Sequence, residues 1–141
     1  MIYIDTSFLA AAYVVDLHTP VVLGRLAARP MVLITAFNRS EAANAVFRQA
    51  FLGKLSLAEV IGAWKTFEND CASGVWKSTA FPAAAWETCS DLARRYGPTL
   101  GVRTLDSLHV ASALELNAER FWTFDERQAR LAEAVGLNTS A

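Results

Sequence analysis

The chain has 141 residues, of which 53% are hydrophobic, so it is long enough for one domain with a substantial core. Its 13 basic and 14 acidic residues nearly cancel, which excludes a strong overall field for nucleic acid or an anionic membrane. Two distant cysteines exclude a disulfide framework and a structural zinc site. Without a leader or an apolar run of about 18 residues, we expect one soluble, cytoplasmic domain over residues 1–141.

The first predicted element is a strand over residues 2–4, which favour extended structure. Asp5 follows it directly, and helix-forming residues begin near Phe8. A carboxylate at the carboxyl end of a parallel strand lies where open α/β sheets bind their ligands. Asp is also a preferred N-cap residue, because its side chain accepts from free N–H groups of the first helical turn. Asp5 alone is therefore compatible with a cap and with a site.

Strands and helices alternate along the rest of the chain. Pro82 is expected in the first turn of its helix, which Gly97-Pro98 should end. This alternation predicts a three-layer α/β domain with a central, mainly parallel sheet flanked by helices. The further strands are predicted at 31–34, 75–78 and 120–123, and the helices at 17–28, 35–52, 56–67, 82–96, 104–117 and 126–135.

Two further carboxylates repeat the setting of Asp5. Asp125 follows the last predicted strand and precedes a helix, although with Gln128 it also matches a capping box. Glu41 either closes a capping box or, if its helix begins near Thr35, lies in the second turn, where no cap is needed. Neither acid by itself decides between a helix cap and a functional site.

Asp106 fits a purely structural role least well. Its helix is apolar on nearly all sides, and an ionised carboxylate buried without a partner costs several kcal/mol. The helix dipole offsets only about 0.3–1 kcal/mol of this cost. Thr104 is expected to cap the helix, so a cap does not require Asp106. A functional partner for Asp106 is therefore the better interpretation.

The acids are expected to converge, because the ends of parallel strands lie along one edge of the sheet. Like charges in one crevice raise one another's pKa unless a cation neutralises them. Oxygen ligands without His or Cys select Mg²⁺ or Mn²⁺, and such a site hydrolyses phosphodiester bonds. The predicted metal ligands are Asp5, Glu41, Asp106 and Asp125.

The motifs around these acids resemble those of PIN-domain nucleases, specifically the VapC-type ribonuclease toxins of bacterial toxin–antitoxin modules. The similarity covers the whole chain and rests on residues 3–7, Ser40-Glu41, residues 104–111 and residues 121–125. It implies a PIN-like fold, a Mg²⁺- or Mn²⁺-dependent endoribonuclease and a cognate antitoxin. One departure is visible, since the family usually closes its sheet with a strand after Gly136, where this chain is short and polar.

The resemblance also assigns roles to single residues. It implies that Asp5 and Asp106 are the principal metal ligands, and that Glu41 and Asp125 complete the acidic pocket. It further implies that Thr6 or Thr123 orients the attacking water. These six residues form the predicted catalytic set.

RNA binding by a chain of nearly zero net charge requires local cations. Arg39, Arg103 and Arg127 lie close in sequence to the predicted acids, and each either holds a phosphate or pairs with a carboxylate. His109 shares a helical face with Asp106, but a single His is more often a packed residue, and we expect it to be packed.

Two other functions remain open. A receiver-like phosphoacceptor also gathers acids at strand ends, but it needs a lysine near its pocket, and the lysines of this chain fall elsewhere. A catalytically silent interaction module with the same fold is the other alternative. Whichever function holds, we expect the protein to form a homodimer. The apolar side chains available for a dimer or an antitoxin helix include Phe47, Phe51, Leu57, Trp64 and Phe67.

Overall fold

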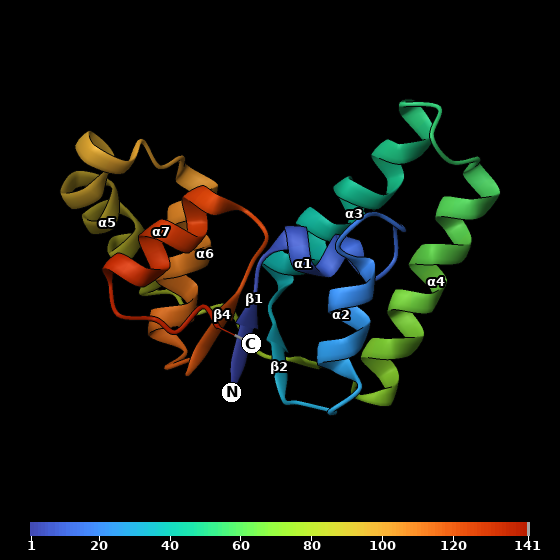
Figure 1. The fold of residues 1–141 in the computed structure, drawn as a ribbon, viewed down its shortest axis with the longest axis horizontal. Coiled ribbons are helices and arrows are strands. Elements are labelled where there is room, and N and C mark those ends of the chain that lie inside the picture. Colours follow the sequence, from blue (N-terminus) through green and yellow to red (C-terminus); the bar gives the residue numbers. More distant parts are fainter. Residues whose placement is uncertain (141) are drawn as a thin grey trace.

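A computed structural model describes residues 1–140. Four parallel strands in the order β3-β2-β1-β4 lie between two layers of helices (Figure 1). This confirms the predicted three-layer α/β architecture. The strands are β1 (Ile2–Ile4), β2 (Val32–Ile34), β3 (Trp76–Ser78) and β4 (Arg120–Trp122), and the helices are α1 (Thr6–Ala11), α2 (Thr19–Leu26), α3 (Ala36–Phe51), α4 (Leu57–Ser73), α5 (Ala85–Leu100), α6 (Thr104–Glu115) and α7 (Glu126–Ala134).

The two faces of the sheet bury two separate cores. Tyr3 pairs in register with Phe121, and Ile4 with Trp122, so these pairs point to opposite faces. Tyr3 and Phe121 pack against α5, α6 and α7, whereas Ile4 and Trp122 pack with side chains of α1 to α4. The helices accordingly form two groups on either side of the sheet (Figure 1).

The start of α3 is fixed by Asn38. Its side-chain oxygen accepts hydrogen bonds from the Thr35 N–H and hydroxyl, both at 2.8 Å, and its amide donates to the Ile4 carbonyl at 2.8 Å. This residue therefore ties α3 to the end of β1. It also places Glu41 in the second turn of α3, so the alternative in which Glu41 closes a capping box is wrong.

The structure corrects the predicted limits of α5, which runs from Ala85 to Leu100. Pro82 precedes the helix instead of lying in its first turn. Pro98 does not end it, because a proline in the last turn removes only one intrahelical N–H bond, and Leu100 still packs against the core beneath α6 and α7. The helix ends at Gly101, which has a φ of +61° and adopts the left-handed conformation that favours glycine.

The polar segment after Gly136 forms a single parallel bridge, between Asn138 and Arg120, in place of a further named strand. The Asn138 carbonyl accepts from the Phe121 N–H at 2.8 Å, and the Ser140 carbonyl accepts from the Trp122 indole at 3.1 Å. The segment is thus fastened beside β4. Within residues 1–140, none of the helices combines the length and the apolar character that crossing a bilayer requires.

Candidate active site

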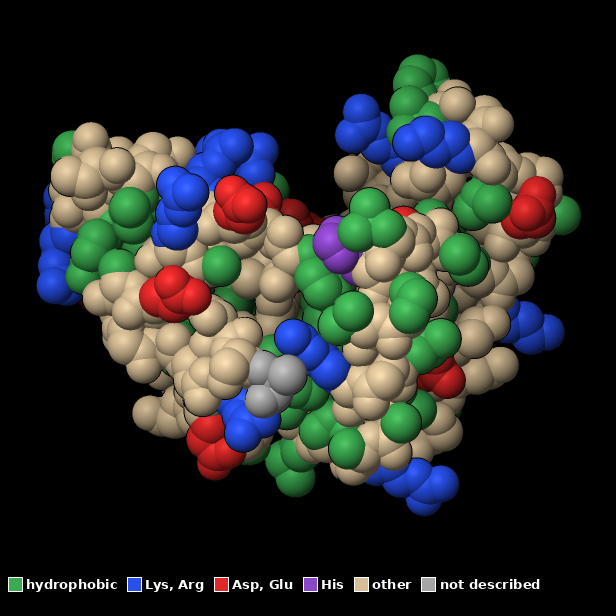
Figure 2. Space-filling model, viewed as in Figure 1, with side chains coloured by type: hydrophobic (Ala, Val, Ile, Leu, Met, Phe, Trp, Pro, Cys, Tyr) green, Lys and Arg blue, Asp and Glu red, His purple; other side chains and the backbone are tan. Residues whose placement is uncertain are grey.

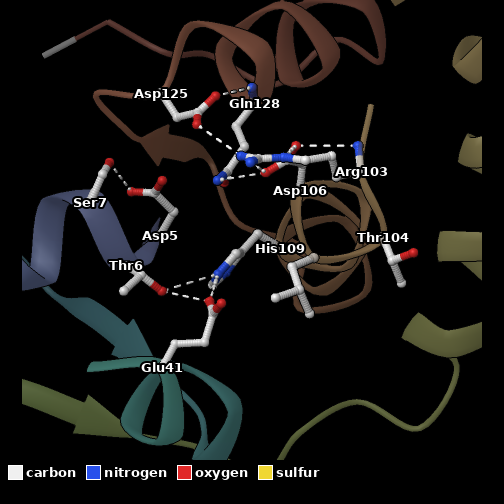
Figure 3. A pocket seen from close by; sticks show the side chains of 11 residues that line it. Asp5, Thr6, Ser7, Glu41, Arg103, Thr104, Asp106, His109, Asp125 and Gln128 are labelled. Carbon is white, nitrogen blue, oxygen red and sulfur yellow. Dashed lines mark hydrogen bonds and ion pairs between the residues drawn. The ribbon is translucent and has the colours of Figure 1, made fainter. Parts of the chain in front are cut away.

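A cavity of about 550 Å³ opens at the carboxyl ends of β1 and β4, between the two groups of helices (Figure 3). All four predicted carboxylates line it, contributed by three helix starts and by the second turn of α3. Acids that lie up to 120 positions apart in sequence therefore face the same cavity. The lining residues are Asp5, Thr6, Ser7, Glu41, Arg103, Thr104, Leu105, Asp106, His109, Asp125 and Gln128.

Asp5 is both a helix cap and a cavity residue. Its Oδ1 accepts from the Phe8 N–H at 3.1 Å and from the Ser7 hydroxyl at 2.7 Å, and its Oδ2 accepts from the Thr123 hydroxyl at 2.8 Å. The side chain is 1% exposed, and this burial raises the pKa of its carboxyl group. Within residues 1–140 it forms no ion pair with a basic side chain.

Asp106 is buried in the first turn of α6 and has an arginine partner. Its Oδ2 accepts from the backbone N–H of Arg103 at 3.2 Å and from the guanidinium Nε of the same residue at 3.0 Å. Its Oδ1 accepts from the Gln128 amide at 3.3 Å. The expectation that Thr104 caps this helix is wrong, because Thr104 is already helical and Arg103 occupies the cap position.

Asp125 caps α7, as its sequence setting suggests. Its Oδ1 accepts from the N–H groups of Arg127 at 2.8 Å and Gln128 at 3.1 Å. The Gln128 side chain does not complete the capping box, because it turns to Asp106 instead. The Oε1 of Gln128 is buried and accepts no hydrogen bond within the described part of the chain.

Arg103 joins two of the acids. Its guanidinium lies 3.0 Å from Asp106 and 3.6 Å from Asp125, so in this structure it pairs with carboxylates (Figure 3). The side chain is 61% exposed, and ion pairs of that exposure contribute little to stability. Arg103 is therefore held at the cavity by contacts that are readily exchanged.

The other two predicted arginines do not line the cavity. Arg39 pairs with Glu68 on α4 at 2.9 Å, and its guanidinium lies over the ring of Trp64. Arg127 is exposed in the first turn of α7, where its backbone N–H binds Asp125. Contacts of these two side chains with a substrate stay predictions.

Glu41 lies opposite Asp5 and has two hydrogen-bond donors. Its Oε1 accepts from the Thr6 hydroxyl at 2.5 Å and also contacts Nε2 of His109 (Figure 3). Burial raises the pKa of Glu41, but the hydrogen bond and the charge interaction with His109, together with the Thr6 bond, outweigh it and hold the pKa below its usual value.

Five lining residues were not in the predicted set, and the side chains of three of them contact a predicted acid. His109 is buried, as expected of a packed residue, but it also lines the cavity and contacts Glu41. Gln128 and Ser7 orient Asp106 and Asp5. Each of the three lies two or three positions from a predicted acid, and spacings of three place side chains on one helical face, so the spacing was the available signal.

The donor set of the cavity fits a hard divalent cation. No three His, Cys, Asp or Glu side chains among residues 1–140 lie close enough together, as they stand, to hold a metal ion. However, the cavity offers carboxylate oxygens from four residues, a buried Asp5 without a basic partner, and the unbonded Oε1 of Gln128. Oxygen donors of this kind are those that Mg²⁺ and Mn²⁺ prefer.

A second cavity, of about 530 Å³, adjoins the first along α3. The two share Thr6, Glu41 and Leu105 in their linings, and the second extends outward past Asn44 and Arg48. Within the described residues Arg48 forms no ion pair. Basic side chains stand on both rims of the hollow between the two halves of the molecule (Figure 2).

Comparison with known proteins agrees with this architecture. VapC20 from Mycobacterium tuberculosis, described as a toxin that cleaves the sarcin–ricin loop, superposes with a TM-score of 0.73 at 18% sequence identity, covering 99% of this chain and 98% of that chain. This likeness concerns the fold. No curated protein sequence matches the chain. The model of the PIN domain matches residues 2–134. The chain therefore belongs to the PIN domain family.

Proposed function

We propose that this protein is a Mg²⁺- or Mn²⁺-dependent endoribonuclease of the toxin type, restrained by a cognate antitoxin. The observation that carries the proposal is the meeting of Asp5, Glu41, Asp106 and Asp125 at one cavity. Membership of the PIN family supports it, because PIN-domain nucleases generally use divalent metal ions.

In this proposal Asp5 and Asp106 are the principal metal ligands, and Glu41 and Asp125 complete the set. A bound divalent ion supplies charge stabilisation at the phosphate and lowers the pKa of a bound water. The protein contributes the orientation of the carboxylates, since each of the four already accepts at least two hydrogen bonds or ion pairs.

Thr6 and Thr123 each donate their hydroxyl hydrogen to a carboxylate, Thr6 to Glu41 and Thr123 to Asp5. Their hydroxyl oxygens retain acceptor capacity, which suits the orientation of an attacking water. Their role in orienting water stays a prediction. Because each hydroxyl donates to a carboxylate, both threonines also position the carboxylates of the proposed site.

Arg103 is the substrate-binding residue that this proposal favours. Asp106 and Asp125 would hold a bound cation in place of the guanidinium, and Arg103 would then be free beside the cavity to contact a phosphate oxygen. Its 61% exposure leaves the side chain free to make that exchange. Arg103 would thus hold the acids before the reaction and the RNA during it.

The exposed end of the α3–α4 pair is the surface that we propose for an antitoxin helix or a second copy of the chain. Phe51 is 86% exposed, Leu57 62% and Ile61 52%. Neighbouring exposed apolar side chains of this kind are typical of interaction surfaces. Phe67 is 1% exposed in the core, so its expected part in such a surface is wrong.

The proposal is tested by incubating antitoxin-free protein with end-labelled RNAs in Mg²⁺, in Mn²⁺ and in EDTA. One RNA should contain a sarcin–ricin loop, and a DNA strand of the same sequence tests the requirement for the 2′-hydroxyl. We expect cleavage of RNA with either metal and none in EDTA. If folded protein cuts none of several RNAs with either metal, the proposal is wrong and the interaction module becomes the better interpretation.

Arg48→Ala is expected to weaken RNA binding, because Arg48 lines the second cavity without an acidic partner in the described chain. Loss of one phosphate contact on a single strand should reduce the slope of log Kd against log salt by about 0.7. Fluorescence anisotropy of a labelled RNA in EDTA, at four salt concentrations, measures this slope. Arg94→Ala is the matched control, because Arg94 pairs with Asp91 on α5 and lines neither cavity. Equal slopes for the Arg48 variant and the unmodified protein would exclude the contact.

A further inference from the structure

A buried hydrogen-bond chain runs from the middle of β1 to the wall of the cavity. The Tyr3 hydroxyl lies 3.1 Å from Nδ1 of His109, and Nε2 of the same ring contacts Oε1 of Glu41. Tyr3 is 0% exposed and His109 1% exposed. The sheet, α6 and α3 each contribute one member, so the chain joins both sides of the cavity.

The direction of the hydrogens in this chain follows from chemistry. An ionised carboxylate has no hydrogen to donate, so the hydrogen between Glu41 and His109 must be on Nε2. In a neutral imidazole Nδ1 is then an acceptor, and the Tyr3 hydroxyl must donate to it. The Glu41 carboxylate therefore requires the hydrogen on Nε2, and the Tyr3 hydroxyl, which is able to donate or accept, satisfies Nδ1 and anchors the ring.

The contacts around the ring also hold it in place. The Phe37 ring centroid lies 4.4 Å from that of His109, and the Tyr3 centroid lies 5.9 Å away. Both donors to Glu41, from Thr6 and from His109, bind the same oxygen, Oε1. Within the described residues no hydrogen bond is made to Oε2, which leaves that oxygen for a ligand in the cavity.

We propose that His109 is a positioning residue for Glu41, and that Tyr3 supports it by holding Nδ1 of the same ring. The Nε2–H of His109 holds Oε1 of Glu41 and so presents Oε2 to the cavity. The effect on RNA cleavage rests on the proposed function. The effect on metal affinity rests on the metal site of that function but not on cleavage, and the state of the imidazole rests on neither, so both are measurable in protein that cleaves nothing.

A pair of amide variants tests this proposal. In His109→Gln the side-chain amide reaches the position of Nε2 and can still donate to Glu41, whereas in His109→Asn it reaches only the position of Nδ1. Removing a hydrogen bond that orients a metal ligand typically costs 10–100-fold in metal affinity or activity. We expect Mn²⁺ affinity, measured by electron paramagnetic resonance, to fall about tenfold or more in His109→Asn and less in His109→Gln. In cleavage assays kcat should follow the same order, with KM for RNA unchanged.

Two controls separate positioning from loss of fold. Ser107→Ala changes another buried residue of α6, whose hydroxyl forms no hydrogen bond within the described chain, and should leave Mn²⁺ affinity unchanged. Urea unfolding of each variant reports whether it is folded. If His109→Asn does not fold, Tyr3→Phe replaces it, because this variant removes only the hydroxyl that holds Nδ1 of the His109 ring.

Nitrogen-15 spectra of the imidazole give a readout that a merely structural role would not move. We expect His109 to carry its hydrogen on Nε2, and the Nδ1 signal to shift in Tyr3→Phe, where that nitrogen loses its hydrogen-bond partner. The proposal is overturned by a bare Nε2 in the unmodified protein, or by folded His109→Asn with unaltered Mn²⁺ affinity and kcat. In the replacement experiment, Tyr3→Phe with an unaltered Nδ1 signal and unaltered Mn²⁺ affinity overturns it. Absence of all RNA cleavage by the unmodified protein would instead contradict the proposed function alone.

Discussion

Asp106→Asn is expected to lower RNA cleavage by at least about 10²-fold and to weaken Mn²⁺ binding, while the chain stays folded. A metal ion contributes several kcal/mol of charge stabilisation, and each 1.36 kcal/mol is about tenfold in rate. The amide keeps the shape of the carboxylate and its acceptor for the Arg103 N–H, but it has no charge for a metal ion. Cleavage of end-labelled RNA and calorimetric titration with Mn²⁺ measure the two effects.

The matched control for this experiment is Asp91→Asn, which removes the same charge from the surface of α5. Asp91 pairs with Arg94 and Arg95 at 3.6 and 3.5 Å, away from the cavity. The Asp91→Asn variant should cleave RNA at the rate of the unmodified protein. Unaltered cleavage by Asp106→Asn, or an equal loss in the control, would remove Asp106 from the proposed site.

Phe8→Ala is expected to destabilise the protein by about 3–5 kcal/mol, the usual cost of removing a fully buried phenyl ring. Phe8 is 0% exposed in α1, and its ring centroid lies 5.3 Å from that of Trp122 and 5.6 Å from that of Phe124. Truncation leaves a cavity beneath the segment that carries Asp5. Domains of this size are stable by only about 5–15 kcal/mol. The expected loss is therefore a large part of the free energy of unfolding.

Urea unfolding followed by tryptophan fluorescence measures this change. Phe51→Ala is the control, because the same truncation at an 86% exposed side chain should alter the free energy of unfolding by no more than about 0.5 kcal/mol. Similar losses for the two variants would contradict the assignment of Phe8 to the core.

Local sequence patterns predicted the elements that position the candidate site. The β-favouring residues 2–4 predicted β1, and the apolar run at 31–34 predicted β2 as a strand buried on both faces. The weak pattern before Pro82 also predicted β3 at the edge of the sheet. Asp5 shows why capping and function need not be alternatives, since one carboxylate oxygen binds Phe8 while the side chain lines the cavity.

Contacts between distant residues were beyond local patterns. His109 and Glu41 are 68 positions apart, and only the tertiary fold brings their side chains together. Similarly, the sequence predicted a capping box between Asp125 and Gln128, but the side-chain amide of Gln128 donates to Asp106 instead. The end of α5 was misplaced for a related reason, because burial of Leu100 outweighs the local preference of Pro98 to stop a helix.

Arg103, which lies between Asp106 and Asp125, bears on whether the chain folds before it binds a metal ion. Those two acids share Arg103, Glu41 accepts hydrogen bonds from His109 and Thr6, and Asp5 forms no ion pair within the described chain. The repulsion among the acids is thereby reduced by groups that the polypeptide itself carries. We therefore expect the protein to fold without a metal ion, unlike small domains that are unfolded without theirs. Under the proposed function, a metal ion would replace Arg103 as the counter-charge of Asp106 and Asp125 in a chain that is already folded.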